Sequence, residues 1–250
     1  MLPRLLTLAV PIMLTNLLQV TYNLVDAWFL GKLGPEAVSA PSIAFSVVVF
    51  LSVFGMAFSQ AGTTLVSQSY GAGKRRLVDF YASQTVSLIT VTGIVVGLVG
   101  VVAVEPLLWL LHVPEAALDG TRVYMRIVFG AVPLMFFFFV LQGVLQGVGD
   151  SITALWVQLV TVTLNAVLDP LLIFGIGPFP EMGVAGAATA TLMSRGVSAA
   201  AILLILFRGR DRLSVRRADL LPRDGAWRKL IGIGIPLATG QGIAALGFTV

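Results

Sequence analysis

Apolar residues form long, nearly uninterrupted stretches along the whole chain, and charged residues gather in the short segments between them. A helix needs roughly 20 apolar residues to cross the hydrocarbon core of a bilayer, which is about 30 Å thick. The pattern therefore predicts six membrane-spanning helices and the beginning of a seventh. The predicted helices cover residues 5–30, 37–69, 80–111, 121–148, 152–176, 184–207 and 227–250.

The composition agrees with this pattern. Apolar residues make up 57% of the chain and charged residues 11%, whereas soluble domains carry about a quarter charged residues. Only helices and closed barrels can span lipid, because the backbone must satisfy its own hydrogen bonds there. The apolar stretches are too long and continuous for the roughly 10-residue strands of a barrel. We predict an all-α fold, a polytopic membrane helical bundle. The absence of cysteine excludes disulfides and thiolate metal sites.

The basic residues predict how these helices are oriented. Lys74, Arg75 and Arg76 follow the second predicted helix, and most other basic residues lie in the segment 208–229, after the sixth. Because basic loops remain in the cytoplasm, we expect a multi-pass protein of the plasma or inner membrane with a cytoplasmic N-terminus. This orientation accounts for the net charge of +4, and we predict no nucleic-acid partner.

Two similar stretches suggest an internal repeat. Pro11 lies early in the first predicted helix and Pro236 lies early in the seventh, and each follows a basic segment. Repeated halves are common in transporters. We therefore predict a six-helix transmembrane lobe at 1–207, a basic cytoplasmic linker at 208–227 and the truncated start of a second lobe at 228–250.

The first predicted helix carries a polar stripe. Gln19, Tyr22, Asn23 and Asp26 follow each other at spacings of one to three residues, and residues three or four apart share one helix face. A carboxylate at mid-bilayer costs at least about 2.5 kcal/mol, so such residues usually have a function. The alternative is that Asp26 lies at the interface, because Gly31 follows closely.

A second carboxylate lies in the fifth predicted helix. Asn165 precedes Asp169 by four residues, and Pro170 has no N–H to donate to the carbonyl four residues before it. The result is a set of oxygen atoms that suits Na⁺ or a proton. Counting residues to the helix ends places Asp26 and Asp169 at similar depths, together with Thr191 of the sixth helix. Asp169 could also simply cap the proline kink, and Thr191 could bond its own backbone.

Three further polar residues lie within predicted helices. Gln142 and Gln146 are four residues apart on one face of the fourth helix, where they line a cavity or join helices by hydrogen bonds. Arg195 is either a buried charge or extends toward the cytoplasmic surface. His112 lies near a loop and is not expected to have a special role.

Several short segments together resemble the multidrug and toxic compound extrusion (MATE) family, in its DinF-like branch. They are Tyr-Asn-Leu-Val-Asp at 22–26, the turn Leu-Gly-Pro-Glu at 33–36, Gln-Gly-Val-Gly-Asp at 146–150, Asn-Ala-Val-Leu-Asp-Pro at 165–170 and Gly-Val-Ala-Gly-Ala-Ala at 183–188. The resemblance implies a twelve-helix transporter of two six-helix lobes, of which this chain is the N-terminal one. It also implies export of drugs, organic cations or metabolites in exchange for H⁺ or Na⁺, with no cofactor and no enzymatic activity.

The resemblance also implies roles for individual residues. The cation or proton site would consist of Asp26, Asn165, Asp169 and Thr191, where Na⁺ is a possible ligand. Pro11 would allow the first helix to bend, as Pro170 does for the fifth. Residues that would line the substrate cavity are Gln19, Tyr22, Asn23 and Gln142. Gln146 stands where the family often has a basic residue. The expected partners are a cationic or amphipathic small molecule, the bilayer and the missing C-terminal lobe.

Two other functions fit parts of the sequence. A flippase for lipid-linked oligosaccharides would share the fold, but it should have a basic cavity for a pyrophosphate, and the candidate site here is acidic. An intramembrane aspartyl protease would use the Gly-Val-Gly-Asp segment ending at Asp150. That residue falls at the boundary of a predicted helix, where a polar turn is the simpler interpretation.

Overall fold

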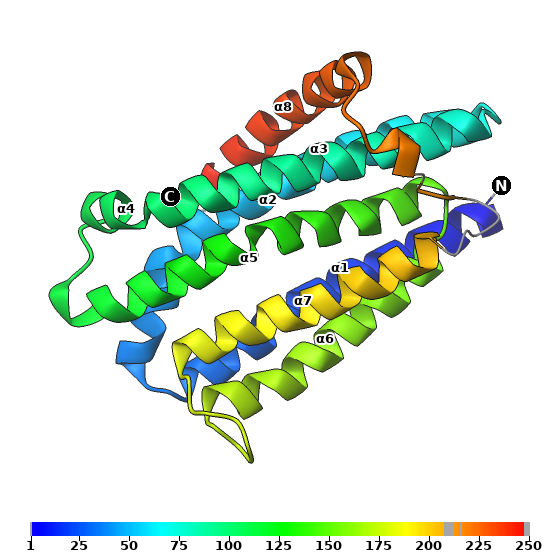
Figure 1. The fold of residues 1–250 in the computed structure, drawn as a ribbon. Coiled ribbons are helices and arrows are strands. Elements are labelled where there is room, and N and C mark those ends of the chain that lie inside the picture. The colour runs from blue at the N-terminus through cyan, green and yellow to red at the C-terminus, as the bar shows by residue number, and fades with distance from the viewer. Residues whose placement is uncertain (1, 208–212, 216, 248–250) are drawn as a thin grey trace.

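The computed structural model describes residues 2–207, 213–215 and 217–247, and all of its regular elements are helical. Along the described chain there are eight α-helices, with one 3-10 turn, η1, before the last of them (Figure 1). The elements are α1 (Leu2–Gly31), α2 (Pro35–Gly71), α3 (Arg75–Val102), α4 (Val104–Leu110), α5 (Glu115–Gly147), α6 (Ser151–Ile173), α7 (Val184–Phe207), η1 (Arg217–Asp219) and α8 (Asp224–Gly247). The predicted all-α class is confirmed.

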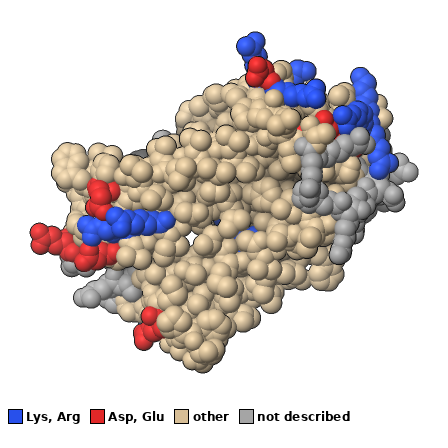
Figure 2. Space-filling view, viewed as in Figure 1, with Lys and Arg blue, Asp and Glu red and all other residues tan. Residues whose placement is uncertain are grey.

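Five segments of the described chain are long and apolar enough to cross a membrane. They are Val47–Gly71, Arg75–Val102, Ala117–Gly147, Ser151–Ile173 and Val184–Leu206. At 30 residues α1 is also long enough, but its polar stripe interrupts its apolar surface. The charged side chains lie mainly at the two ends of the molecule. Figure 2 shows acidic side chains mainly at the end where α4 meets α5, basic ones mainly at the opposite end and a broad uncharged band between them.

The third predicted helix is not continuous. We predicted one span over residues 80–111, but α3 ends at Val102 and α4 begins at Val104. Pro106 accounts for the break, because it cannot donate a hydrogen bond to the carbonyl of Val102 and it disfavours helical geometry in the residue before it. The membrane-spanning part is therefore α3 alone, and α4 is a short separate helix.

The helices form two groups that meet through α5 (Figure 1). One group packs α2, α3 and α5 together around a core that includes Ile89, Phe136 and Leu141, with α8 against α2. The other packs α6 against α1 and α7, and α5 joins it by packing on α7. Direct contact between α1 and α2 is slight, so the two groups separate along that side.

Glycines allow the closest helix contacts. A Cβ atom at Gly186 of α7 would lie 2.5 Å from the carbonyl oxygen of Leu172 in α6. Since that atom belongs to the backbone, it could not move aside for a side chain. The absence of a side chain at Gly186 therefore allows α6 and α7 to pack this closely.

The segment after α7 packs against the rest of the protein where it is described. Leu213 and Val215 are buried in the main core. Asp219 accepts two hydrogen bonds from the guanidinium of Arg76, at 2.8 and 3.3 Å. Residues 208–212 and 216 of the predicted linker lie outside the described residues. The division of the chain at 207 and 227 remains a prediction, and α8 begins at Asp224.

Candidate functional site

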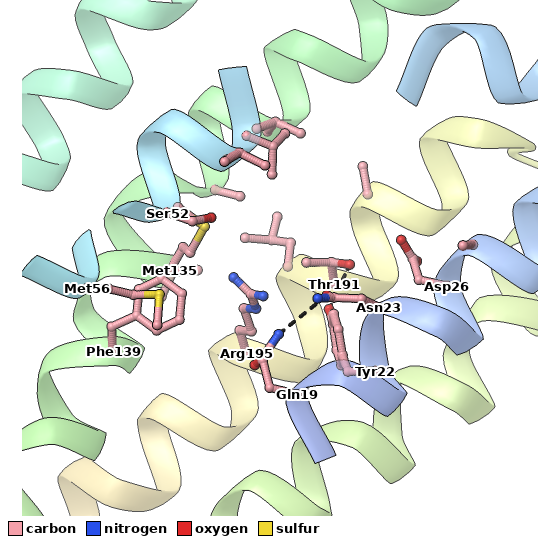
Figure 3. A pocket seen from close by; sticks show the side chains of 18 of the residues that line it. Gln19, Tyr22, Asn23, Asp26, Ser52, Met56, Met135, Phe139, Thr191 and Arg195 are labelled. Carbon is pink, nitrogen blue, oxygen red and sulfur yellow. Dashed lines mark hydrogen bonds between the residues drawn. The ribbon is translucent and has the colours of Figure 1, made fainter. Parts of the chain in front are cut away.

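A cavity of about 820 Å³ lies between the two helix groups. Residues of α1, α2, α5, α6 and α7 line it, and α1 contributes more polar side chains than any other helix (Figure 3). Six of the predicted site residues are among the lining: Gln19, Tyr22, Asn23, Asp26, Gln142 and Thr191. The spacing along α1 thus places its polar stripe on the face that borders the cavity.

Side-chain amides from three helices form a chain of hydrogen bonds beside the cavity. Gln142 of α5 donates to Gln158 of α6 at 3.1 Å, and Gln158 donates to Gln19 of α1 at 3.2 Å. Gln19 in turn donates to Asn23 at 3.4 Å. Gln142 therefore does both things that we considered for it, since it lines the cavity and joins helices.

A separate hydrogen bond ties α1 to α7. The hydroxyl of Tyr22 donates to the hydroxyl of Thr191 at 2.8 Å, although the two residues are far apart in sequence. The interpretation of Thr191 as only a backbone-bonded hydroxyl is wrong, because its side chain is engaged across the helix interface.

Asn165 and Asp169 are fully buried in α6. The amide of Asn165 donates to Oδ1 of Asp169 at 3.1 Å, as their spacing predicts. Asp26 and Asp169 come from helices that pack together, α1 and α6, and their charges lie within electrostatic range of each other. Asn165 and Asp169 are not among the residues that line the cavity.

Three oxygen atoms in this region are buried and unpaired. Across the described residues, four buried side-chain polar atoms have no hydrogen-bond partner: Oδ1 of Asp26, Oδ1 of Asn165, Oδ2 of Asp169 and the indole nitrogen of Trp227. Three of these four are acceptors from the predicted cation site. An unsatisfied buried acceptor costs about 1–3 kcal/mol, so this cluster is suited to a ligand that brings positive charge or a proton.

The prolines of the prediction both lie within helices. Pro11 is in α1, where its carbonyl accepts a hydrogen bond from the Thr15 hydroxyl at 2.8 Å. Pro170 is in α6, directly after Asp169. Gln146 is half-buried near the end of α5 and is not among the cavity-lining residues, so the structure does not bring it together with the others.

Asp150 caps a helix. Its Oδ1 accepts from the backbone N–H of Thr153 at 3.2 Å, and it stands at the N-terminal cap of α6. This confirms the polar turn that we preferred to a protease aspartate.

Sequence reasoning missed several residues of the cavity, among them a glutamine and a tyrosine. Gln158 of α6 connects Gln142 to Gln19, and Tyr124 of α5 lines the cavity wall. Gln158 could have been found as a polar residue in an apolar helix, whereas a tyrosine among apolar residues gives no such signal. Arg195, for which two interpretations were open, also lines the cavity.

The donor set does not resemble a resident metal centre. Within the described part of the chain, no group of three or more His, Cys, Asp or Glu side chains is placed to hold a metal ion. Two carboxylates, an amide and a hydroxyl are hard oxygen donors of low total charge. They suit a small monovalent cation or a proton better than a transition metal.

Several known proteins have sequences similar to this chain. The sequence profile of the MatE family matches residues 11–171. The chain is 30% identical over 239 residues to the "Probable multidrug resistance protein NorM" of Thermotoga maritima, covering 94% of this chain and 50% of that protein. It is also 30% identical over 237 residues to the "FAD transporter" of Shewanella oneidensis, covering 94% of this chain and 52% of that protein.

Solved structures agree on the fold. A multidrug resistance MATE family transporter of the MOP superfamily, in an outward-facing conformation, matches with a TM-score of 0.87 and 26% sequence identity. The match covers 95% of this chain and 52% of that one, so the chain spans about half the length of the proteins it matches. The chain belongs to the MatE family and is a multi-pass membrane protein.

Proposed function

We propose that this chain is the cation-coupling lobe of a secondary exporter, which moves drugs, organic cations or metabolites out of the cell in exchange for H⁺ or Na⁺. Asp26, Asn165, Asp169 and Thr191 form the coupling site, and the cavity beside them receives the substrate. The basic end of the molecule faces the cytoplasm, with the N-terminus on that side. A second lobe completes the transporter, since inward and outward opening requires two halves that move against each other.

The observation that carries this proposal is the set of three buried, unpaired oxygens on Asp26, Asn165 and Asp169. A protein that only needed to fold would lose stability by keeping such a cluster. An ion or proton that enters from outside satisfies these atoms and neutralises the carboxylates. The polar wall of the cavity then attracts a cationic or polar substrate less strongly, and the substrate is released.

Asp26 can couple ion binding to substrate binding by itself. An ion can shift the equilibrium between two states only by its different affinity for each. Asp26 both lines the cavity and carries one of the unpaired oxygens. It is therefore the residue through which occupation of the buried site changes the surface that the substrate meets.

The proposal is tested by efflux from cells or proteoliposomes under imposed Na⁺ and pH gradients, with the intact protein. Asp26→Asn and Asp169→Asn should each reduce gradient-driven efflux at least about tenfold, the lower end of what a charge-assisted interaction contributes. Asp119→Asn is the matched control, because this carboxylate is 93% exposed on α5. Undiminished coupled export in both site variants would refute the proposal.

A further inference from the structure

Arg195 is a basic side chain inside the cavity. It lies on α7, one turn after Thr191, and Figure 3 shows its guanidinium projecting between the helices toward the middle of the cavity. Its Cζ atom lies 5.3 Å from the ring centre of Tyr22 and 5.4 Å from that of Phe139. The two aromatic rings hold the charge in place by cation–π attraction, so the side chain does not extend to the cytoplasmic surface.

Within the described part of the chain, the donors of this guanidinium have no acceptor. An arginine has five N–H donors and no acceptor of its own, yet Arg195 makes no hydrogen bond or ion pair with any residue that the structure describes. Arg76, Arg122 and Arg126 all pair with carboxylates. Asp26 is within electrostatic range of Arg195, but the two do not form an ion pair.

The remaining lining limits what can bind there. Among the described lining residues, Asp26 is the only acid and Arg195 the only base. The facing wall is apolar and polarizable, with Met56, Met135 and Phe139 seen opposite the polar residues in Figure 3. A ligand that fits this cavity therefore has an apolar body and a polar edge.

We propose that Arg195 is a subsite for an oxyanion of the substrate, a carboxylate or phosphate attached to a planar ring system. A guanidinium binds such a group through two parallel hydrogen bonds. With Asp26 in the same cavity, the preferred substrates are zwitterions, which carry an anionic group for Arg195 and a cationic group for the acidic end. This inference rests on the proposed function in so far as the cavity is the substrate site.

The test is equilibrium binding of two dyes to the intact protein in detergent, without any ion gradient. One dye is a rhodamine with a free benzoate, and the other is the methyl ester of the same dye, which keeps the planar cation but loses the anion. Wild type should bind the free acid more tightly than the ester. Arg195→Gln should lower this preference about tenfold by weakening binding of the acid alone, since a charge-assisted hydrogen bond is lost.

Two further variants make the result specific. Arg195→Lys keeps the charge but not the planar fork, so it should keep the preference for the acid in reduced form, and it serves if the glutamine variant fails to fold. Arg126→Gln removes a positive charge outside the cavity and should bind as wild type does. An equal loss for both dyes in Arg195→Gln, or a wild type without preference for the acid, would overturn the inference.

This outcome is independent of the coupling mechanism. If the exporter proposal fails, Asp26→Asn and Asp169→Asn still export against gradients, while the ratio of the two dye affinities is unaffected. If only the Arg195 subsite is wrong, coupled export still depends on the two carboxylates, and the acid and ester dyes respond alike to Arg195→Gln.

Discussion

Two buried polar clusters can be compared in this chain, one between α1 and α6 and one where the segment after α7 meets α3. Both contain acidic and amide side chains that are almost fully buried. In the second cluster, Asp79 accepts from the backbone and hydroxyl of Ser214 at 3.0 and 3.1 Å. In the first, each of Asp26, Asn165 and Asp169 keeps an unpaired oxygen.

The difference separates a structural cluster from a functional one. Gln84 shows how complete the second cluster is, because it donates to the carbonyls of Asp219 and Leu221 and accepts from the N–H of Arg223. Such a network fixes one conformation. The first cluster is left with acceptors only, which is unfavourable for folding alone and useful for binding a cation. Burial of an acid therefore does not indicate its role, whereas the satisfaction of its oxygens does.

The largest expected effect comes from breaking the satisfied cluster at its centre. Gln84→Leu leaves two carbonyls and one N–H without their partner. At about 1 kcal/mol or more for each unsatisfied group, the free energy of unfolding should fall by roughly 3 kcal/mol. The melting temperature of the purified intact protein measures this. A melting temperature equal to that of wild type would show that the segment after α7 is not held as described.

A matched pair of aspartate variants compares the two clusters directly. Asp79→Asn should lower the free energy of unfolding by about 1–2 kcal/mol, because an amide replaces an oxygen that accepts from Ser214. Asp169→Asn in the absence of Na⁺ should cost nothing or increase stability, since it removes a buried charge that lacks a full set of partners. Equal destabilisation by both substitutions, measured in the same thermal assay, would remove the distinction between the clusters.

A smaller effect is expected at the edge of the cavity. Tyr22→Phe removes the hydrogen bond to Thr191 and should cost about 1 kcal/mol of stability. Thr191→Val should cost a similar amount. The double variant should then cost less than the sum of the two single ones, and strictly additive losses would contradict a direct bond between these side chains.

The sequence was informative where a polar residue interrupts an apolar helix. Asp26, Asn165 and Asp169 stand out because a polar group in lipid is costly, and their spacing indicated which of them share a helix face. The lengths of the apolar stretches located the helices, but the break at Pro106 was missed, because the apolar pattern continues across it.

Other features depend on contacts between distant segments, which no local pattern reveals. Asp79 meets Ser214 and Gln84 meets Leu221 across more than a hundred residues. Gln158 becomes important only because Gln142 and Gln19 lie on either side of it. The stacking of Arg195 on Tyr22 and Phe139 likewise needs three helices to be assembled.

The most direct test of the central claim is whether the unpaired oxygens bind a cation. The melting temperature of the intact protein is measured as Na⁺ replaces choline at constant ionic strength, and separately as the pH is lowered. The same two series are measured for the double variant Asp26→Asn, Asp169→Asn. A ligand that binds only the folded state raises stability with its concentration. We expect wild type to be stabilised by Na⁺ or by protons and the double variant to lose that response. An identical response in the two proteins would show that these carboxylates do not bind the coupling ion.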